Sequence, residues 1–297
     1  MNWLVFSITA SIFWALGTLI DKYILTKHMQ DPFSYQLLYT ITELPILLLL
    51  LLTSISPTFP WFMLGIVGGL GTYLALILYF KAMAIEEASR VISLIYIGPI
   101  FVLILAFVFL GESLSFLMYS GVVFLVLGAT FISYRKVEGG ASVISPALGL
   151  LLASSLLLAG CEVLSKYVLG FIDYASYLFW NFIGSLIIGF FLFCFSKIRS
   201  NFLKDIKRVG RAVLFWRILN TSMGLAAIIL YYIAISSGLV SLVSAVTSVE
   251  PFFVFIFAIL FSLFVPRVLK EDIGKRALVA KTLAVILIIA GTWLIAS

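Results

Sequence analysis

A few ionisable side chains lie within long apolar stretches of this 297-residue chain, where each needs a physical reason. Glu250 is the most informative of them, because it lies in the middle of an apolar stretch and is followed directly by Pro251. A charge at the centre of a bilayer costs about 2.5–3.5 kcal/mol on insertion scales, and the proline leaves a backbone carbonyl without its helical donor. We expect Glu250, near mid-membrane, to bind a substrate, a proton or a cation; the alternative is a neutral or locally hydrogen-bonded structural carboxyl.

Three other acidic side chains share this setting. Glu43 lies midway along a predicted span, where a structural contact and a functional role are equally compatible with the sequence. Glu162 precedes Lys166 by four residues, a favourable ion-pair spacing on a helix, so we expect the two to neutralise each other near a helix end. Asp21 and Lys22 are adjacent near the end of the first span, and we expect an interface pair or a gate there.

Arg217 and Asn220 lie in the first turns of another predicted span. Arg217 can extend its side chain to the polar end of the span as an anchor, or it can contact an anionic group of a substrate. His28 is the only histidine and falls in a predicted loop, so we expect no metal site and no cofactor. The sequence has no H-E-x-x-H, G-x-S-x-G or nucleotide-binding loop, which disfavours an intramembrane enzyme and direct drive by ATP.

One pattern occurs twice at identical spacing and fixes the architecture that must position these groups. The first copy is Tyr79-Phe80-Lys81-Ala82, then Ser89, then Pro99, and the second is Tyr231-Tyr232-Ile233-Ala234, then Ser241, then Pro251. The sequence is therefore a duplication. Glu250 stands where the first copy has Gly98, so the charge breaks the symmetry at a point where an asymmetric ligand would require it.

The composition places the chain in a membrane. Hydrophobic residues make up 63% and charged residues 11% of the sequence, against roughly 45–50% and about 25% in soluble domains. Ten apolar runs are long enough to be spans; they lie near 3–26, 33–53, 61–85, 89–111, 114–134, 146–169, 174–196, 212–236, 239–264 and 277–296. Helix-ending Pro and Gly residues separate them. The predicted fold is all-helical with ten transmembrane helices.

Five runs fall in each copy, over residues 1–138 and 139–297. An odd number of spans forces the second copy to enter the membrane from the opposite side, which gives two inverted five-helix repeats, as in secondary transporters. Glycines should let some helices approach closely and slide; they are Gly65, Gly68, Gly69 and Gly71 in the third run and Gly184 and Gly189 in the seventh.

The charge distribution predicts the orientation. All but one of the 19 Lys and Arg residues lie in or beside odd-numbered connections between spans, and the exception is Lys166. By the positive-inside rule these connections face the cytoplasm and both termini lie outside a multi-pass cell-membrane protein. The net charge of +6 is then a signal of topology and not of nucleic-acid binding. Within residues 197–211, apolar and basic positions alternate at helical spacing, which predicts an amphipathic connector on the membrane surface.

Several short motifs resemble those of one transporter family. They are Phe13-Trp14-Ala15-Leu16-Gly17, the Tyr79 to Ser89 block running into Pro99, Leu110-Gly111-Glu112 and Gly128. On these residues the chain resembles the EamA-type members of the drug/metabolite transporter superfamily. The second copy departs from the pattern, because Leu263-Phe264 stands opposite Gly111-Glu112.

The resemblance carries expectations of its own. It implies a central cavity lined by the first, third, fourth, sixth, eighth and ninth spans, and it points to four aromatic residues there: Trp14, Tyr79, Tyr96 and Tyr231. A likeness to sugar-phosphate translocators of the superfamily implies that Lys81 and Arg217 form a cationic mouth for phosphate or carboxylate. It also implies that both termini are cytoplasmic, whereas the charge count, which we follow, places them outside.

Together these observations predict a secondary active transporter. We expect it to export small polar or amphipathic metabolites by alternating access, with coupling to protons or another ion, as a monomer or homodimer in the bilayer. The alternative is a flippase for a lipid or a lipid-linked sugar, which would need a lateral opening that one sequence does not reveal. A channel or scaffold would not require a repeat built around a central charge.

Overall fold

The computed structural model describes residues 2–85, 95, 97–132, 146–264 and 275–296, and the secondary structure in this part of the chain is helical throughout. The first half contains α1 (Asn2–Lys27), α2 (Pro32–Leu50), α3 (Trp61–Ile85), α5 (Gly98–Leu110) and α6 (Phe116–Ile132). The second half contains α7 (Pro146–Val168), α8 (Tyr174–Cys194), α9 (Ser196–Arg208), α10 (Arg211–Ser237), α11 (Val240–Thr247), α12 (Glu250–Phe264) and α13 (Lys275–Ala296).

Six of these helices are long and apolar enough to cross a membrane, namely α1, α2, α3, α7, α8 and α10. Four shorter apolar helical segments accompany them, at Gly98–Leu110, Phe116–Gly128, Val240–Val254 and Leu283–Ile295. The third of these includes all of α11 and the start of α12. The chain is therefore a multi-pass helical membrane protein. The helices follow the predicted apolar runs closely, although the first part of the fourth run lies outside the described residues.

The ninth predicted run is not one continuous helix, which corrects the expectation. It breaks between α11 and α12, just before Pro251. Proline has no amide hydrogen to donate to the carbonyl four residues earlier, which is that of Thr247. The hydroxyl of Ser11 on α1 donates to this carbonyl instead, at 3.3 Å. A freed backbone acceptor thus obtains a partner from another helix, as membrane helices require.

Two helices begin with the same cap in the two halves. Asp31 precedes α2, and its carboxylate accepts hydrogen bonds from the backbone and the hydroxyl of Ser34. Asp173 precedes α8 and accepts the same two bonds from Ser176. An aspartate in this position satisfies amide groups that have no partner within the helix. The repeated Asp-x-x-Ser sequence is therefore a repeated helix start.

Glycines bring α3 and α8 into backbone contact, as predicted. A Cβ atom at Gly69 would collide with the backbone carbonyl oxygen of Asn181, and one at Gly184 would collide with that of Ile66. Elsewhere α1 packs along α10, α3 along α7, and α6 along α13. Small residues of this kind are the usual means of close helix packing in lipid.

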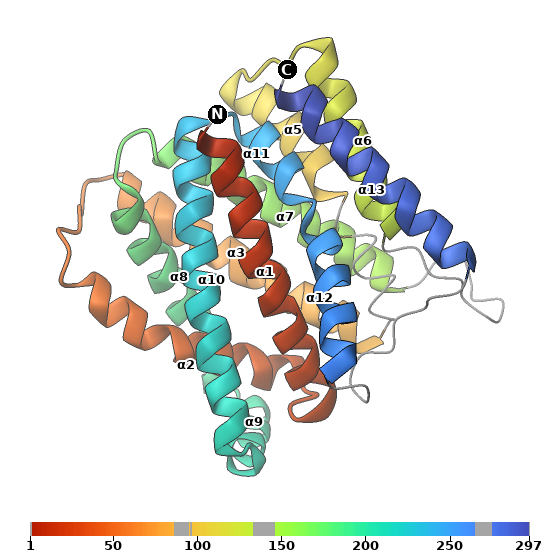
Figure 1. Cartoon of the computed structure of the whole chain (residues 1–297). Helices are drawn as coiled ribbons and strands as arrows, with labels where there is room; N and C mark the ends of the chain where they lie inside the picture. The colour runs from red at the N-terminus through yellow and green to blue at the C-terminus, as the bar shows by residue number, and fades with distance from the viewer. Residues whose placement is uncertain (1, 86–94, 96, 133–145, 265–274, 297) are drawn as a thin grey trace.

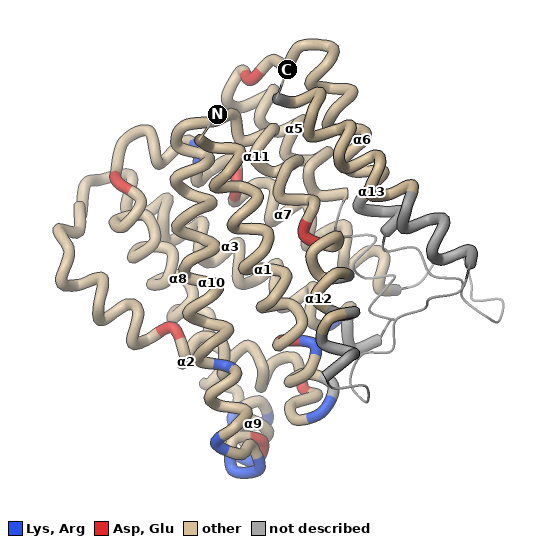
Figure 2. Tube along the Cα trace, in the orientation of Figure 1, with Lys and Arg blue, Asp and Glu red and all other residues tan. Residues whose placement is uncertain are grey.

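The two ends of the molecule differ in charge. Both termini lie at one end, and the short helix α9 lies at the other (Figure 1). Lys and Arg residues gather on α9 and near the end of α1, as Figure 2 shows. On α9, Phe202 is buried while Lys204 and Lys207 are exposed, so this helix is amphipathic; its position on a membrane surface stays a prediction.

Candidate functional site

A cavity of about 430 Å³ lies in the interior of the helix bundle. Its walls come from both halves of the chain, from α1, α2, α3, α5, α7, α8, α10, α11 and α12. It extends to Lys22 and Leu25 in the last turns of α1, near the end that carries α9. Four acidic residues line it: Asp21, Glu43, Glu162 and Glu250.

Most of the predicted site residues reach this cavity. It is lined by Trp14, Asp21, Lys22, Glu43, Tyr79, Pro99, Glu162, Asn220, Tyr231 and Glu250. Lys81, Lys166, Arg217 and Pro251 are not among its lining residues. Tyr96 lies outside the described residues.

Glu250 is the first residue of α12, directly after the break between α11 and α12. The hydroxyl of Thr18 on α1 donates a hydrogen bond to its Oε1 at 2.8 Å. A helix N-terminus carries a partial positive charge that favours a carboxylate. The same break that frees the Thr247 carbonyl thus places a half-buried acidic side chain in the cavity wall, where the Thr18 hydroxyl and the helix N-terminus offset part of the cost of removing its charge from water.

Glu43 is held by hydroxyl groups from two other helices. It is buried, and it accepts hydrogen bonds from the hydroxyl of Tyr73 on α3 and from that of Ser185 on α8, the latter at 2.9 Å. Both carboxyl oxygens therefore have a donor. Glu43 joins α2, α3 and α8, which is the structural contact, and it also lines the cavity, where a functional role stays a prediction.

Arg217 is buried and paired, which corrects the prediction of an anchor that extends to the polar end of its span. Its side chain is 1% exposed, and its Nη1 lies 3.0 Å from Asp21 Oδ1. It donates to the Tyr35 hydroxyl at 3.1 Å and to the Thr42 hydroxyl at 3.3 Å, and it lies 4.0 Å from the centre of the Tyr39 ring. Buried charges are stable only with partners of this kind.

The same cluster surrounds the Asp21 carboxylate. The Tyr35 hydroxyl and the Asn220 amide both donate to Asp21 Oδ1, in addition to Arg217. Asp21 therefore uses Arg217 as its counter-ion, which is not the adjacent Lys22 that we expected. Sequence reasoning missed Tyr35, Tyr39 and Thr42, the partners of Arg217 on α2. Tyr35 and Tyr39 precede the predicted Glu43 at intervals of four residues on one helix face.

Two predicted arrangements of basic side chains are absent from the described structure. Lys81 lies 4.8 Å from the centre of the Phe33 ring, and Arg217 is enclosed in its cluster, so the two do not form a cationic mouth. Lys166 does not pair with Glu162. Its Nζ donates to the backbone carbonyls of Ile235 and Gly238, at 2.5 and 2.8 Å, where α10 ends.

Glu112, from the Leu-Gly-Glu motif, caps the helix that follows this connection. Its carboxylate accepts hydrogen bonds from the backbone amides of Val240 and Ser241, at 2.8 and 3.1 Å, and from the Ser241 hydroxyl at 2.5 Å. Gly111 has a φ of 66°, a left-handed conformation that glycine adopts without strain, and it ends α5 so that Glu112 can turn toward α11.

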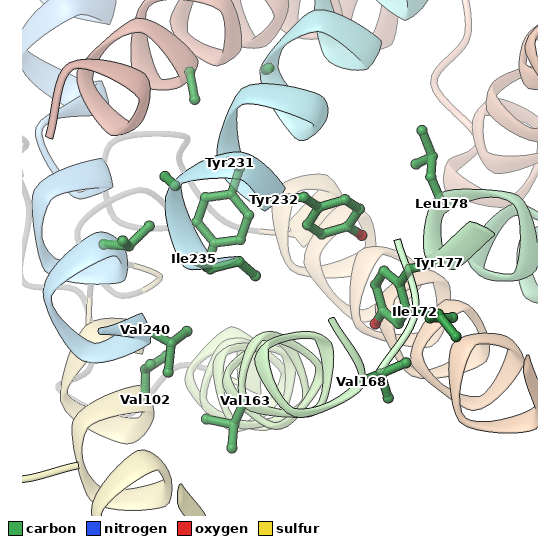
Figure 3. Packing of buried hydrophobic residues seen from close by; sticks show 14 of the residues in the cluster. Val102, Val163, Val168, Ile172, Tyr177, Leu178, Tyr231, Tyr232, Ile235 and Val240 are labelled. Atoms are coloured by element: carbon green, nitrogen blue, oxygen red, sulfur yellow. The ribbon is translucent and has the colours of Figure 1, made fainter. Parts of the chain in front are cut away.

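Aromatic side chains form much of the remaining wall. The rings of Trp14 and Tyr231 lie 5.3 Å apart, and those of Tyr177 and Tyr232 lie 5.2 Å apart. Figure 3 shows Tyr231 and Tyr232 projecting from α10, with Tyr177 beside Tyr232. In the described structure, Glu162 Oε2 and the Tyr231 hydroxyl are buried without a hydrogen-bond partner.

An acidic cavity shared by two halves of a helical membrane protein defines a candidate binding site for a small molecule. Residues 1–134 match the model of the EamA-like transporter family, which is part of the drug/metabolite transporter superfamily. Members of that family are membrane transporters. A solved structure described only as "Crystal structure of protein" has the same fold, with a TM-score of 0.72 and 16% identity over 98% of this chain and 94% of that chain. No curated protein matches the sequence.

Proposed function

We propose that the protein is a secondary active transporter that exports small polar or amphipathic metabolites by alternating access, coupled to protons through Glu250. The observation that carries this proposal is the cavity shared by both halves, with Glu250 in its wall at a helix break. Protonation of a carboxyl in the wall changes the charge of the cavity, which is a simple means of coupling the flux of protons to that of a substrate.

The packing of the helices supports two inverted repeats, over residues 1–138 and 139–297. In such a fold α1 and α7 are equivalent, as are α3 and α10, α5 and α12, and α6 and α13. The contact of α1 with α10 then corresponds to that of α7 with α3, and the contact of α1 with α12 corresponds to that of α7 with α5. The pair α6 and α13 corresponds to itself. All of these contacts occur.

A pair of hydrogen bonds supports the same register at the level of single residues. The Ser155 hydroxyl on α7 donates to the Ile95 carbonyl at 3.5 Å, four residues before Pro99. This repeats the contact of Ser11 with the carbonyl of Thr247. In each half, a serine from the first helix thus binds the carbonyl that a proline has freed.

The basic end of the molecule supports the proposed direction of transport. The positive-inside rule places α9 and its Lys and Arg residues at the cytoplasmic face of the cell membrane, with both termini outside. The cavity extends toward that face, whereas the buried side chains of Val168, Ile235 and Val240 pack together toward the termini. A cavity that takes up its substrate from the cytoplasm is the loading state of an exporter.

Proteoliposomes test the proposal directly. A panel of radiolabelled metabolites is screened for flux with and without a proton gradient, for the wild type and for Glu250→Gln, which keeps the shape of the side chain but does not titrate. We expect gradient-driven flux in the wild type and its loss in the variant. The matched control is Asp205→Asn on α9, outside the cavity, which should leave flux unchanged.

Two outcomes would overturn parts of the proposal. If Glu250→Gln transports with the pH dependence of the wild type, Glu250 is not the coupling group. If no solute moves but a fluorescent lipid crosses the bilayer, the protein is a flippase.

A further inference from the structure

At one pair of equivalent positions, the first half has a hydroxyl side chain and the second half has a carboxyl. On α1, Thr18 lies seven residues after Ser11, and on α7, Glu162 lies seven residues after Ser155. The matching serine contacts with the carbonyls of Thr247 and Ile95 fix this register. Thr18 and Glu162 are therefore equivalent positions on equivalent helices.

The residue equivalent to the partner of Thr18 differs as well. Thr18 faces Glu250, the first residue of α12, and donates a hydrogen bond to it. Glu162 corresponds to Thr18, and Gly98, the first residue of α5, corresponds to Glu250. One junction therefore holds a hydroxyl and a carboxyl that satisfy each other, and at the equivalent positions of the other stand a carboxyl and a residue without a side chain.

Open space accompanies the carboxyl that lacks a donor. A Cβ atom built on Gly98 would have no neighbour within 4 Å, and both Gly98 and Glu162 line the cavity. Glu162 Oε2 has no hydrogen-bond partner in the described structure, and neither has the hydroxyl of Tyr231, which is 4% exposed. The Tyr231 and Ser244 hydroxyls face this carboxyl without completing a hydrogen bond to Oε2. Buried polar atoms are normally paired, so a group supplied from outside can bridge these side chains beside the open space.

The chemistry of the wall indicates what that group is. The cavity has four acidic residues, of which Asp21 is neutralised by Arg217, while Glu43 and Glu250 accept hydroxyl donors. Glu162 has neither a counter-ion nor a completed hydroxyl donor at Oε2, and a donor with positive charge would both pair with it and neutralise it. No cluster of three or more metal ligands occurs in the described residues, which disfavours a metal ion.

Aromatic rings near Glu162 indicate the shape of the ligand. Trp14 and Tyr231 form a ring pair in the cavity wall, and Tyr232 lies next to Tyr231. An ammonium group gains from aromatic faces as well as from a carboxylate, and an apolar body packs against the rings. A primary amine on an aromatic body satisfies all of these groups together.

We propose that Glu162 and Tyr231, with the open space at Gly98, form the docking site for the ammonium group of the substrate, so that the transported metabolites are small aromatic amines. This inference rests on the proposed function and names its substrate class. The carboxylate accepts from the ammonium group, the ammonium group donates to the Tyr231 hydroxyl, and the aromatic body lies against Trp14.

Equilibrium binding to the purified protein in nanodiscs tests this assignment without any transport step. Three probes share an indole ring and differ in charge: tryptamine is a cation, 3-ethylindole is neutral and indole-3-propionate is an anion. We expect tryptamine to bind at least about tenfold more tightly than either of the others, since a charge-assisted hydrogen bond contributes that much. Phenethylamine and butylamine extend the series toward smaller bodies.

Variants locate the site. Glu162→Gln should weaken tryptamine binding by about tenfold or more and leave 3-ethylindole binding unchanged. Gly98→Ser should supply Glu162 with the hydroxyl that Thr18 gives Glu250, and so weaken tryptamine binding more than the matched Gly98→Ala, which adds bulk alone. Asp205→Asn on α9 should bind all probes as the wild type does. Gly98→Ser provides the test even if Glu162→Gln does not fold.

The inference is overturned if tryptamine binds no more tightly than 3-ethylindole. It is also overturned if Glu162→Gln, or failing that Gly98→Ser, binds tryptamine as tightly as the wild type does, because Glu162 is then a protonated structural group. Flux separates the two proposals. Binding that requires Glu162 without gradient-driven flux refutes the proposed function alone, and gradient-driven flux without charge-selective binding refutes this inference alone.

Discussion

The two ends of the molecule are held together by different kinds of contact. At the end that carries α9, side chains bind side chains: Arg217 on α10 joins Asp21 on α1 to Thr42 on α2. At the end that carries the termini, side chains bind the backbone: Glu112 and Lys166 hold the two helix ends between α10 and α11. The first set can separate without unfolding a helix, whereas the loss of the second frays helix ends. A rocking motion would therefore open more readily at the end that carries α9.

The largest effect should come from Arg217→Ala. It removes the counter-ion of the Asp21 carboxylate, which is 25% exposed, so we expect a loss of about 3 kcal/mol, the lower end of the range for buried pairs. The free energy of unfolding, measured by SDS titration in mixed micelles, should fall by this amount. Arg217→Lys keeps the charge but loses the forked contacts to Asp21 and Thr42, so its loss should be smaller. Equal stability of the alanine variant and the wild type would contradict the cluster's role.

Glu112→Ala should have the next largest effect. It removes the cap of α11 and leaves the amides of Val240 and Ser241 without an acceptor, for a loss of about 2 kcal/mol. The same titration measures it. Glu112→Gln retains one carbonyl acceptor and should lose about half as much. If both variants are as stable as the wild type, the Glu112 cap does not contribute to the stability of the protein.

Lys166→Met should have the smallest effect. The methionine keeps the apolar stem and loses two hydrogen bonds to backbone carbonyls, for a loss of about 1 kcal/mol. Hydrogen exchange should become faster at the amides of Gly238 and Val240 and remain unchanged at Asn220, near the other end. Faster exchange at both ends would show that the two sets of contacts are not independent.

The sequence predicted local features of the fold well and contacts between helices poorly. Apolar runs gave the helices, and the aspartates before α2 and α8 act as caps, because both features depend on neighbouring residues. Pro251 indicated a freed carbonyl, but we did not predict that the helix would break there. A proline can either kink a helix or end it, and the surrounding helices decide between these outcomes.

Partner choice among charged residues could not be predicted. Glu162 and Lys166 have ideal spacing for an ion pair, yet Lys166 binds carbonyls about 70 residues away in sequence. Asp21 pairs with Arg217, which is 196 residues distant in sequence, and not with the adjacent Lys22. Such partners depend on which helices are neighbours in space. A duplication with exact spacing could have supplied this information, because it relates the contacts of one half to those of the other.

The contact between α3 and α8 limits how the sequence can change over evolutionary time. At Gly69 and Gly184 the facing backbone leaves no room even for a methyl group, so no single substitution fits without separating the two helices. A second substitution to a smaller neighbouring side chain would not make room for a larger residue at either position, because the atom in the way is a main-chain carbonyl oxygen. We therefore expect descendants of this gene to keep both glycines while the cavity residues vary with the cargo.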